Sequence, residues 1–179
     1  MTITIRRTTP SDVLAAEQVL DDGRRALAAR GIPQWLDEYP NRIDVEADMA
    51  KDASYVAVSE DGSILGTMAL AFDGERTYDA IEGAWLTASD TTAPRYAVIH
   101  RCAISSTAAR QGIMTLMFEE GERIARAHGA ESIRIDTHER NEPVQGLVAK
   151  LGYERCGIIT LTHTGDADPL RIAFEKVLA

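Results

Sequence analysis

The stretch that decides the fold is residues 96–114, YAVIHRCAISSTAARQGIM. Residues 96–104 are mostly apolar and predict the longest strand of the protein. A turn rich in Ser, Thr and Ala ends at Gly112, and apolar side chains then recur at helical spacing from Ile113 to about His128. A helix begins with unpaired backbone N–H groups and the positive end of its dipole, so this unit is a candidate anion site suited to a pyrophosphate, although Gly112 also fits a simple turn.

The segments on either side extend this unit to a mixed α/β fold. A helix from about Ser11, the expected N-cap, to Arg30 precedes an aromatic loop over 31–41. Residues 73–94 are expected to be an irregular connection, and Asn141 is expected to cap a helix. The remaining elements are strands at about 3–6, 55–59, 64–72, 132–137, 154–162 and 171–177, a short helix at 44–51, and a turn near 165–168. We therefore expect one domain over residues 1–179, with a single sheet and helices on both faces.

The composition excludes several classes of protein. The 179 residues are 45% hydrophobic and 26% charged, which is typical of a globular domain. A net charge of −9 argues against nucleic acid or an anionic membrane as partner. No apolar run approaches the ~20 residues of a membrane-spanning helix, and the first residues do not resemble a secretory signal, so a cytoplasmic protein is expected. The absence of G-x-x-x-x-G-K-[ST] and G-x-G-x-x-G argues against ATP and NAD.

The charge is distributed unevenly along the chain. Residues 101–140 hold six Arg and six acidic residues, so this window is neutral while the rest of the chain is acidic. An anionic cofactor is therefore expected to bind there. Two distant cysteines, Cys102 and Cys156, are expected to be buried thiols, because neither a disulfide scaffold nor a zinc site has this spacing.

Four segments resemble the core motifs of the GNAT superfamily of N-acetyltransferases. They are residues 102–114, the strand Ile133-Arg-Ile-Asp-Thr-His138, Asn141, and Lys150-Leu-Gly-Tyr153. The similarity in element order spans almost the whole chain, whereas the specific motifs cover about residues 96–160. The resemblance implies a mostly antiparallel twisted sheet and an acetyl-CoA-dependent N-acetyltransferase that needs no metal. The acceptor would be a primary amine on a small molecule or peptide.

The resemblance also implies where acetyl-CoA binds. Strand 96–104 would splay from strand 132–137, and the pantetheine arm would lie in the gap like an extra strand. Asn141 would hydrogen-bond the cofactor. The arm would contact the backbone of Cys102, Ala103 and Ile104. The pyrophosphate would lie against the backbone of Arg110, Gln111, Gly112, Ile113, Met114 and Thr115, and Ala109 just before them would also belong to the cofactor site.

Four positions depart from the family pattern. Ala109 stands where the phosphate motif usually has Arg or Gln, and Met114 where it has Gly or Ala, so we expect weaker cofactor binding or a shifted loop. Val148 occupies the place of a Tyr that protonates the thiolate, and Val98 the place of a Glu that acts as base. These departures favour, as an alternative, a non-catalytic acyl-CoA-binding or regulatory protein on the same fold. A third interpretation is a structural domain that binds no CoA.

Histidines offer substitutes for the missing base. His100 follows Val98 by two residues and so shares its face of a regular strand, where it fits either a general base or a structural histidine. Asp136 and His138 fit either an orienting pair or an anchor for the turn after their strand. A metal site at these three residues, and a nucleophilic role for Cys102, are disfavoured.

Acceptor specificity is expected to lie in the loop between Gly31 and Asn41. Trp35 and Tyr39 fit either a pocket wall over the thioester or a lid on the core, and Trp85 is similar. Asp37 and Glu38 are expected to attract an amine, which leaves a polyamine, an amino sugar and a peptide N-terminus as candidates. The oligomeric state stays open, with a homodimer as one option.

Overall fold

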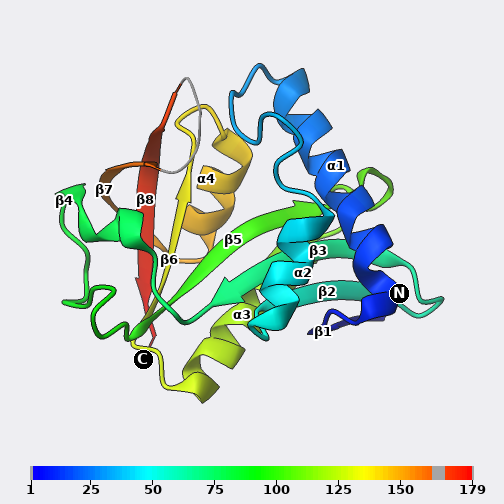
Figure 1. Cartoon of the computed structure of the whole chain (residues 1–179), viewed down its shortest axis with the longest axis horizontal. Helices are drawn as coiled ribbons and strands as arrows, with labels where there is room; N and C mark the ends of the chain where they lie inside the picture. The colour runs from blue at the N-terminus through cyan, green and yellow to red at the C-terminus, as the bar shows by residue number, and fades with distance from the viewer. Residues whose placement is uncertain (1, 163–167, 179) are drawn as a thin grey trace.

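A twisted sheet forms the centre of the computed structural model, which describes residues 2–162 and 168–178 (Figure 1). Its strand order is β1-β2-β3-β5-β6-β8-β7-β4. The strands are β1 (Ile3–Arg7), β2 (Ser54–Ser59), β3 (Ile64–Ala71), β4 (Ile81–Gly83), β5 (Tyr96–Ile104), β6 (Ser132–Thr137), β7 (Glu154–Thr160) and β8 (Leu170–Val177). The α-helices are α1 (Val13–Ala29), α2 (Arg42–Ala50), α3 (Ile113–His128) and α4 (Glu142–Lys150). Of the turn expected near 165–168, all but Asp168 lies outside the described residues.

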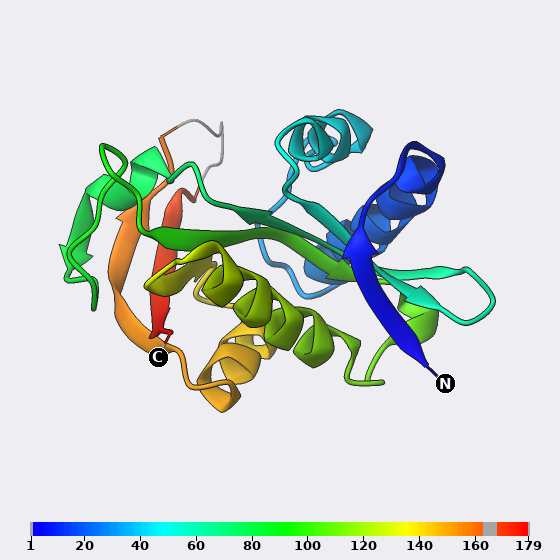
Figure 2. The same ribbon diagram turned by 90° about the horizontal axis from the view of Figure 1, so that it is seen from below.

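The arrangement confirms the expected fold. Six of the strand pairs are antiparallel and one, β5 with β6, is parallel. Figure 2 shows α1 and α2 on one face of the sheet and α3 and α4 on the other. None of the described helices is both long enough and apolar enough to cross a bilayer.

Each helical layer buries its own core. Met117 and Phe118 of α3 and Val148 of α4 pack on one face of the sheet, and Leu20 of α1 and Val45 of α2 pack on the other. The side chains of alternate strand residues point to opposite faces, so both faces of the central strands can be apolar. The sheet therefore positions its central strands rigidly between two cores.

Strand β4 was not predicted, because residues 73–94 were expected to be irregular. Its Ile81 pairs with Ile159 and its Gly83 with Gly157, both on β7, so β4 forms the far edge of the sheet. A Cβ at Gly83 would lie 2.2 Å from the carbonyl oxygen of Cys156, so only glycine allows this approach. Three residues are too few to show strand alternation, and the partner strand is distant in the sequence.

The start of α1 also differs from the prediction. A 3₁₀ turn, Pro10–Asp12, precedes the helix. The turn carries a capping box in which the Thr9 side chain and Asp12 satisfy each other's backbone groups, so Ser11 is not the N-cap. Arg6 binds Asp12 through two hydrogen bonds, which hold the pKa of that carboxyl well below its usual range.

A buried ion pair fixes the segment between β4 and β5. Arg134 and Glu175 are both fully buried, with Arg134 Nε 3.0 Å from a Glu175 carboxylate oxygen. The Arg134 guanidinium lies between the rings of Trp85 and Tyr96, 4.3 and 3.9 Å from their centroids. Trp85 therefore packs on this ion pair and does not line the cleft between β5 and β6, so of its two alternatives the structure shows the lid on the core.

Candidate functional site

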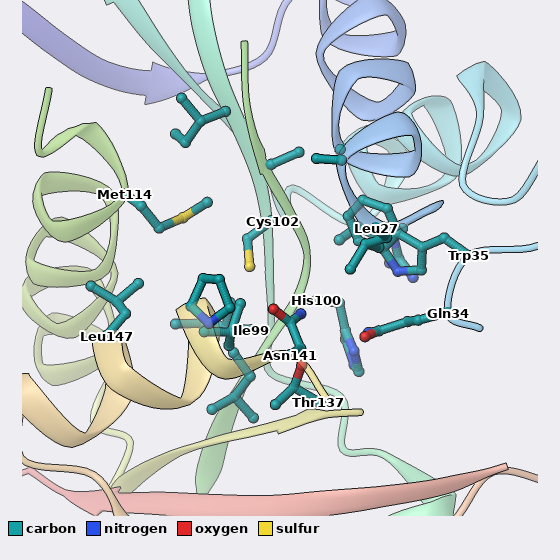
Figure 3. Close-up of a pocket in the computed structure, with 18 of the residues that line it drawn as sticks. Leu27, Gln34, Trp35, Ile99, His100, Cys102, Met114, Thr137, Asn141 and Leu147 are labelled. Carbon is teal, nitrogen blue, oxygen red and sulfur yellow. The ribbon is translucent and has the colours of Figure 1, made fainter. Parts of the chain in front are cut away.

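A cleft opens where the two parallel strands separate. β5 and β6 are paired only from Tyr96 to Val98 and from Ser132 to Arg134. Beyond Val98 the strands diverge, and a cleft of about 630 Å³ lies between them, walled also by α1, the loop after it, α3 and α4. The backbone of β5 from Ile99 onward bonds β3 on one side and faces the cleft on the other (Figure 3). The splay that the family resemblance implied is present.

A β-bulge in β5 sets which side chains face which wall of the cleft. Ala69 pairs with His100 and Thr67 with Ala103, so β5 carries one extra residue here, and Arg101 has a positive φ of 47°. Ala103 packs with the α1 core, whereas Cys102 packs with the α3–α4 core. The bulge therefore puts Cys102 and His100 on opposite faces, where regular alternation would put them on one.

The start of α3 closes one end of the cleft. Gly112, at the N-cap, has a φ of 76°, and an ideal Cβ on it would meet no atom within 4 Å. No side chain caps the helix, and Leu116 is the first residue whose N–H bonds back, to the Gly112 carbonyl. All the residues predicted for the pyrophosphate, from Arg110 to Thr115, line the cleft, and so does Ala109. Their first-turn N–H groups form a ready anion site.

The opposite wall comes from the end of β6 and the start of α4. Asn141 lies at the N-cap of α4, as predicted, but its side chain makes no capping bond, so its amide remains for the cleft that it lines. Thr137, which the sequence analysis did not identify, also lines the cleft. Val148, at the position of the family's Tyr, is fully buried in the core, and Leu147 faces the cleft instead (Figure 3).

His100 lies in the cleft beside a carboxylate that the sequence did not reveal. Its Nε2 is 3.6 Å from Oε2 of Glu75, and both side chains are about one-fifth exposed. The other oxygen of Glu75 accepts hydrogen bonds from the backbone N–H (3.1 Å) and hydroxyl (2.8 Å) of Thr77. These bonds orient the carboxylate toward the imidazole. Glu75 belongs to the segment expected to be irregular, and only its charge marked it in the sequence.

Asp136 and His138 do not form a pair. Asp136 lines the cleft and accepts a 2.8 Å hydrogen bond from the Tyr78 hydroxyl. Burial, with the Asp136 charge adding to it, raises the pKa of Tyr78 well above its usual value. His138 is fully buried outside the cleft lining, where Nδ1 accepts the Arg140 N–H (3.1 Å), so Nε2 donates to Asp168 (2.9 Å). His138 is thus the turn anchor of the two alternatives.

Trp35 and Tyr39 both line the cleft, on the side of α1. The Trp35 ring also packs on α1 at Gly23, where a Cβ would lie 2.8 Å from the ring, so it serves as pocket wall and core lid together. The Tyr39 hydroxyl accepts a 3.3 Å hydrogen bond from the Arg101 guanidinium. The Nε of Arg101 in turn donates a 2.8 Å hydrogen bond to Asp48.

The two acidic residues of this loop that were expected to attract an amine lie outside the cleft, so that prediction is wrong. Asp37 and Glu38 are exposed and do not line the cleft. The carboxylates that do line it are Glu75 and Asp136. An ammonium group entering the cleft would therefore meet carboxylates from two other segments of the chain.

Cys102 is unsuited to nucleophilic catalysis. Burial, with the Asp136 charge adding to it, raises the pKa of its thiol to about 12. The thiol is therefore neutral at physiological pH, and the thiolate is the reactive form. Within residues 2–162 and 168–178, no group of three or more His, Cys, Asp or Glu side chains could hold a metal ion.

Comparison with known proteins agrees with the fold. Residues 20–153 match the family model of the Acetyltransferase (GNAT) family. The chain therefore belongs to the GNAT family of acetyltransferases. No curated protein matches the chain in sequence.

Solved structures of the same family resemble this one along their whole length. A GNAT acetyltransferase from Streptococcus agalactiae is 31% identical, with a TM-score of 0.83 over 98% of this chain and 95% of that one. A GNAT acetyltransferase from Listeria monocytogenes is 18% identical, with a TM-score of 0.73 over 98% and 95%. A phosphinothricin acetyltransferase from Sinorhizobium meliloti, solved in complex with acetyl-CoA, is 16% identical, with a TM-score of 0.70 over 100% and 90%. The last two show the fold alone.

Proposed function

We propose that this protein transfers an acetyl group from acetyl-CoA to a primary amine of a small molecule or peptide. The observation that best supports this proposal is the cleft between β5 and β6. The N-terminus of α3 lies at one end of the cleft, and the His100–Glu75 pair lies near the other end. An anion site and a candidate base at opposite ends of one cleft suit a substrate with a charged tail and a reacting head.

The residues present fit acetyl-CoA. The N–H groups at the start of α3 suit the pyrophosphate, and Arg110 lies beside them. The backbone of β5 from Cys102 to Ile104 faces the cleft with no strand on that side, so an extended arm bearing amides can pair with it. The amide of Asn141 reaches the same space from the other wall.

The acceptor would enter from the side of α1. Glu75 and Asp136 provide negative charge for an ammonium group, and the Trp35 ring provides an apolar wall. A primary amine is mostly protonated at neutral pH and must lose a proton before it can attack. His100 Nε2 is the candidate acceptor of this proton, and Glu75 would stabilise the imidazolium that forms.

When bound, acetyl-CoA supplies a thioester whose acyl carbon bonds to the amine as the bond to sulfur breaks, with the CoA thiolate as leaving group. A backbone N–H of β5 facing the cleft would donate to the developing oxyanion. Val148, at the position of the family's Tyr, has no acidic proton to give to the thiolate, so water would supply that proton. No covalent enzyme intermediate is required, which agrees with the neutral Cys102 thiol.

Thermal unfolding with and without acetyl-CoA tests the cofactor first. At ~100 times its dissociation constant a ligand adds about 2.7 kcal/mol to stability, which raises Tm by about 5–11 °C for a domain of this size. An unchanged Tm at millimolar acetyl-CoA would contradict the proposal. Thiol release in the presence of a panel of amines then tests transfer.

The pH profile of transfer tests the base. In His100→Gln the rate should fall by about 10²–10⁴-fold and should no longer rise through the histidine titration range. Glu75→Gln keeps the hydrogen bonds from Thr77 but removes the charge, so the apparent pKa of the rate profile should fall. An unaltered profile in His100→Gln would exclude it as base.

One observation favours the alternative, a non-catalytic acyl-CoA-binding protein. Val98 and Val148 stand where the family often has a base and an acid, and both are fully buried. Acetyl-CoA binding without thiol release on the amine panel would support this alternative.

A further inference from the structure

Thr137, the last residue of β6, carries a buried hydroxyl without a partner. The residue is 2% exposed, and its Oγ1 makes no hydrogen bond within the part of the chain that the structure describes. A buried hydroxyl that makes no hydrogen bond destabilises the folded state. The Tyr153 hydroxyl is also buried without a hydrogen bond within the described residues, but Tyr153 packs against Phe118 in the core and does not line the cleft. Thr137 does line it.

The strand register places Thr137 opposite the bulge in β5. Val98 and Arg134 are the last paired residues of β5 and β6. Three residues beyond this last pair, the corresponding positions on the two diverging strands are Arg101 and Thr137. On its other side β6 pairs with β8 through backbone groups, Thr137 with Ile172, which leaves the hydroxyl unused.

The side chain of Thr137 belongs to the α3–α4 face of the sheet. Ile133 and Ile135 pack in that core, and Thr137 follows them at strand spacing. Cys102 packs on the same face. Asp136 points to the opposite face, where it meets Tyr78. The hydroxyl therefore lies on the face of the sheet proposed for the arm of acetyl-CoA, opposite the face to which Asp136 points.

We propose that Thr137 is a binding residue for the pantetheine arm, and that its hydroxyl hydrogen-bonds the arm's amide nearest the sulfur. This inference rests on the proposed function. A threonine hydroxyl can donate to an amide carbonyl or accept from an amide N–H, so either amide group suits it. With the arm held by the β5 backbone on one side and by Thr137 on the other, the bound ligand bridges the two separated strands. The buried hydroxyl then gains its partner only in the complex.

Two matched substitutions test the proposal. Thr137→Val and Tyr153→Phe each remove one unpartnered buried hydroxyl and keep the shape of the side chain. Titration calorimetry on the full chain would use three probes: acetyl-CoA, CoA, and 3′-phospho-ADP, which is the nucleotide half of CoA without the arm. Thr137→Val should bind acetyl-CoA and CoA about five- to tenfold more weakly, as expected for one neutral hydrogen bond, and 3′-phospho-ADP unchanged.

The controls separate binding from packing. Tyr153→Phe should bind all three probes as the wild type does, and Thr137→Ser, which keeps the hydroxyl, should retain most of the affinity for acetyl-CoA. The Tm of free Thr137→Val should hold or rise by about 2–4 °C, because the variant loses a buried polar group and no hydrogen bond.

The outcomes distinguish this inference from the proposed function. If the wild type binds neither acetyl-CoA nor CoA, the proposed function fails. If the wild type binds and Thr137→Val binds equally well, only the role of Thr137 is overturned. A loss that extends to 3′-phospho-ADP would indicate a distorted site, and a loss confined to acetyl-CoA would move the contact to the acetyl group; both results overturn the assignment to the arm.

Discussion

Replacing Gly112 by Asp should weaken acetyl-CoA binding strongly without unfolding the protein. Gly112 has a φ of 76°, and a Cβ on it meets no atom within 4 Å, so a side chain costs backbone strain but no clash. Asn and Asp tolerate this left-handed conformation best among residues with a side chain. Gly112→Asn is therefore the matched control, since it carries the same strain and size without the charge.

The size of the effect follows from Coulomb's law. A carboxylate about 5 Å from a pyrophosphate charge is repelled by about 0.8 kcal/mol in water and about 3 kcal/mol at an effective dielectric constant of about 20. Allowing for partial screening, we expect Gly112→Asp to bind about 10–100 times more weakly than Gly112→Asn. The Asp variant should be no less stable than the Asn variant, because the α3 N-terminus favours a negative charge.

The assay is calorimetric titration with acetyl-CoA at low and high salt. The difference in affinity between Gly112→Asp and Gly112→Asn should become smaller as the salt concentration rises. Gly129 supplies a second control: it ends the same helix with a φ of 84°, and a Cβ there also meets nothing within 4 Å. Gly129→Asp should lose stability at this negative end of the dipole and keep its affinity. Equal affinities of Gly112→Asp and Gly112→Asn for acetyl-CoA would show that the pyrophosphate does not lie beside α3.

Three further predictions concern other parts of the structure. Glu175→Gln should cost about 3–5 kcal/mol in urea unfolding at pH 7, because Arg134 stays buried without its carboxylate. Burial would raise the pKa of Glu175, but the hydrogen bonds that it accepts outweigh burial and lower the pKa below 4.5. The ionised carboxylate therefore stabilises the fold above about pH 4.5, and this stabilisation is lost as the pH falls further. The stability of Glu175→Gln should not show this decrease with falling pH. Cys102 is partly buried and lines the cleft, and burial raises its pKa to about 12, so it should react with a disulfide reagent at pH 8 far more slowly in the native protein than after unfolding; equal rates would refute that environment. Asp48→Asn should lower stability by about 1–3 kcal/mol in thermal unfolding, because Arg101 loses its charged partner, and an unchanged Tm would show that solvent replaces it.

The parts of the fold that the sequence predicted correctly are those with local signals. Strand β5 was predicted with its observed bounds, because residues 96–104 form an apolar run bounded by polar turns. The turn at Gly112 was recognised because glycine precedes a helical pattern, and the structure shows the positive φ that glycine favours. Both signals depend on neighbouring residues alone.

The parts that were missed depend on distant contacts. Glu75 lies beside His100 because of the course of the connection between β3 and β5. No hydrophobic periodicity in the sequence predicts the course of such a segment. The bulge at Arg101 arises from pairing with β3, and it reverses the face that strand alternation assigns to Cys102. Asn141 was expected both to cap α4 and to contact the cofactor, and its side chain lines the cleft without making the capping bond.

The path of the chain to β4 also sets an order of assembly during synthesis. The first four strands of the sheet order, β1-β2-β3-β5, can pair once residues 1–104 have left the ribosome, but β4 pairs with β7, whose residues emerge much later. Until then Tyr78 and Trp85, which form an aromatic pair in the native state, can pack on Tyr96 of β5 but lack the part of their native surface that β7 and β8 supply. Chain synthesis at about 5–20 residues per second leaves this aromatic segment open for several seconds. During that time the segment between β3 and β5 is incompletely covered and therefore accessible to chaperones, or to aggregation.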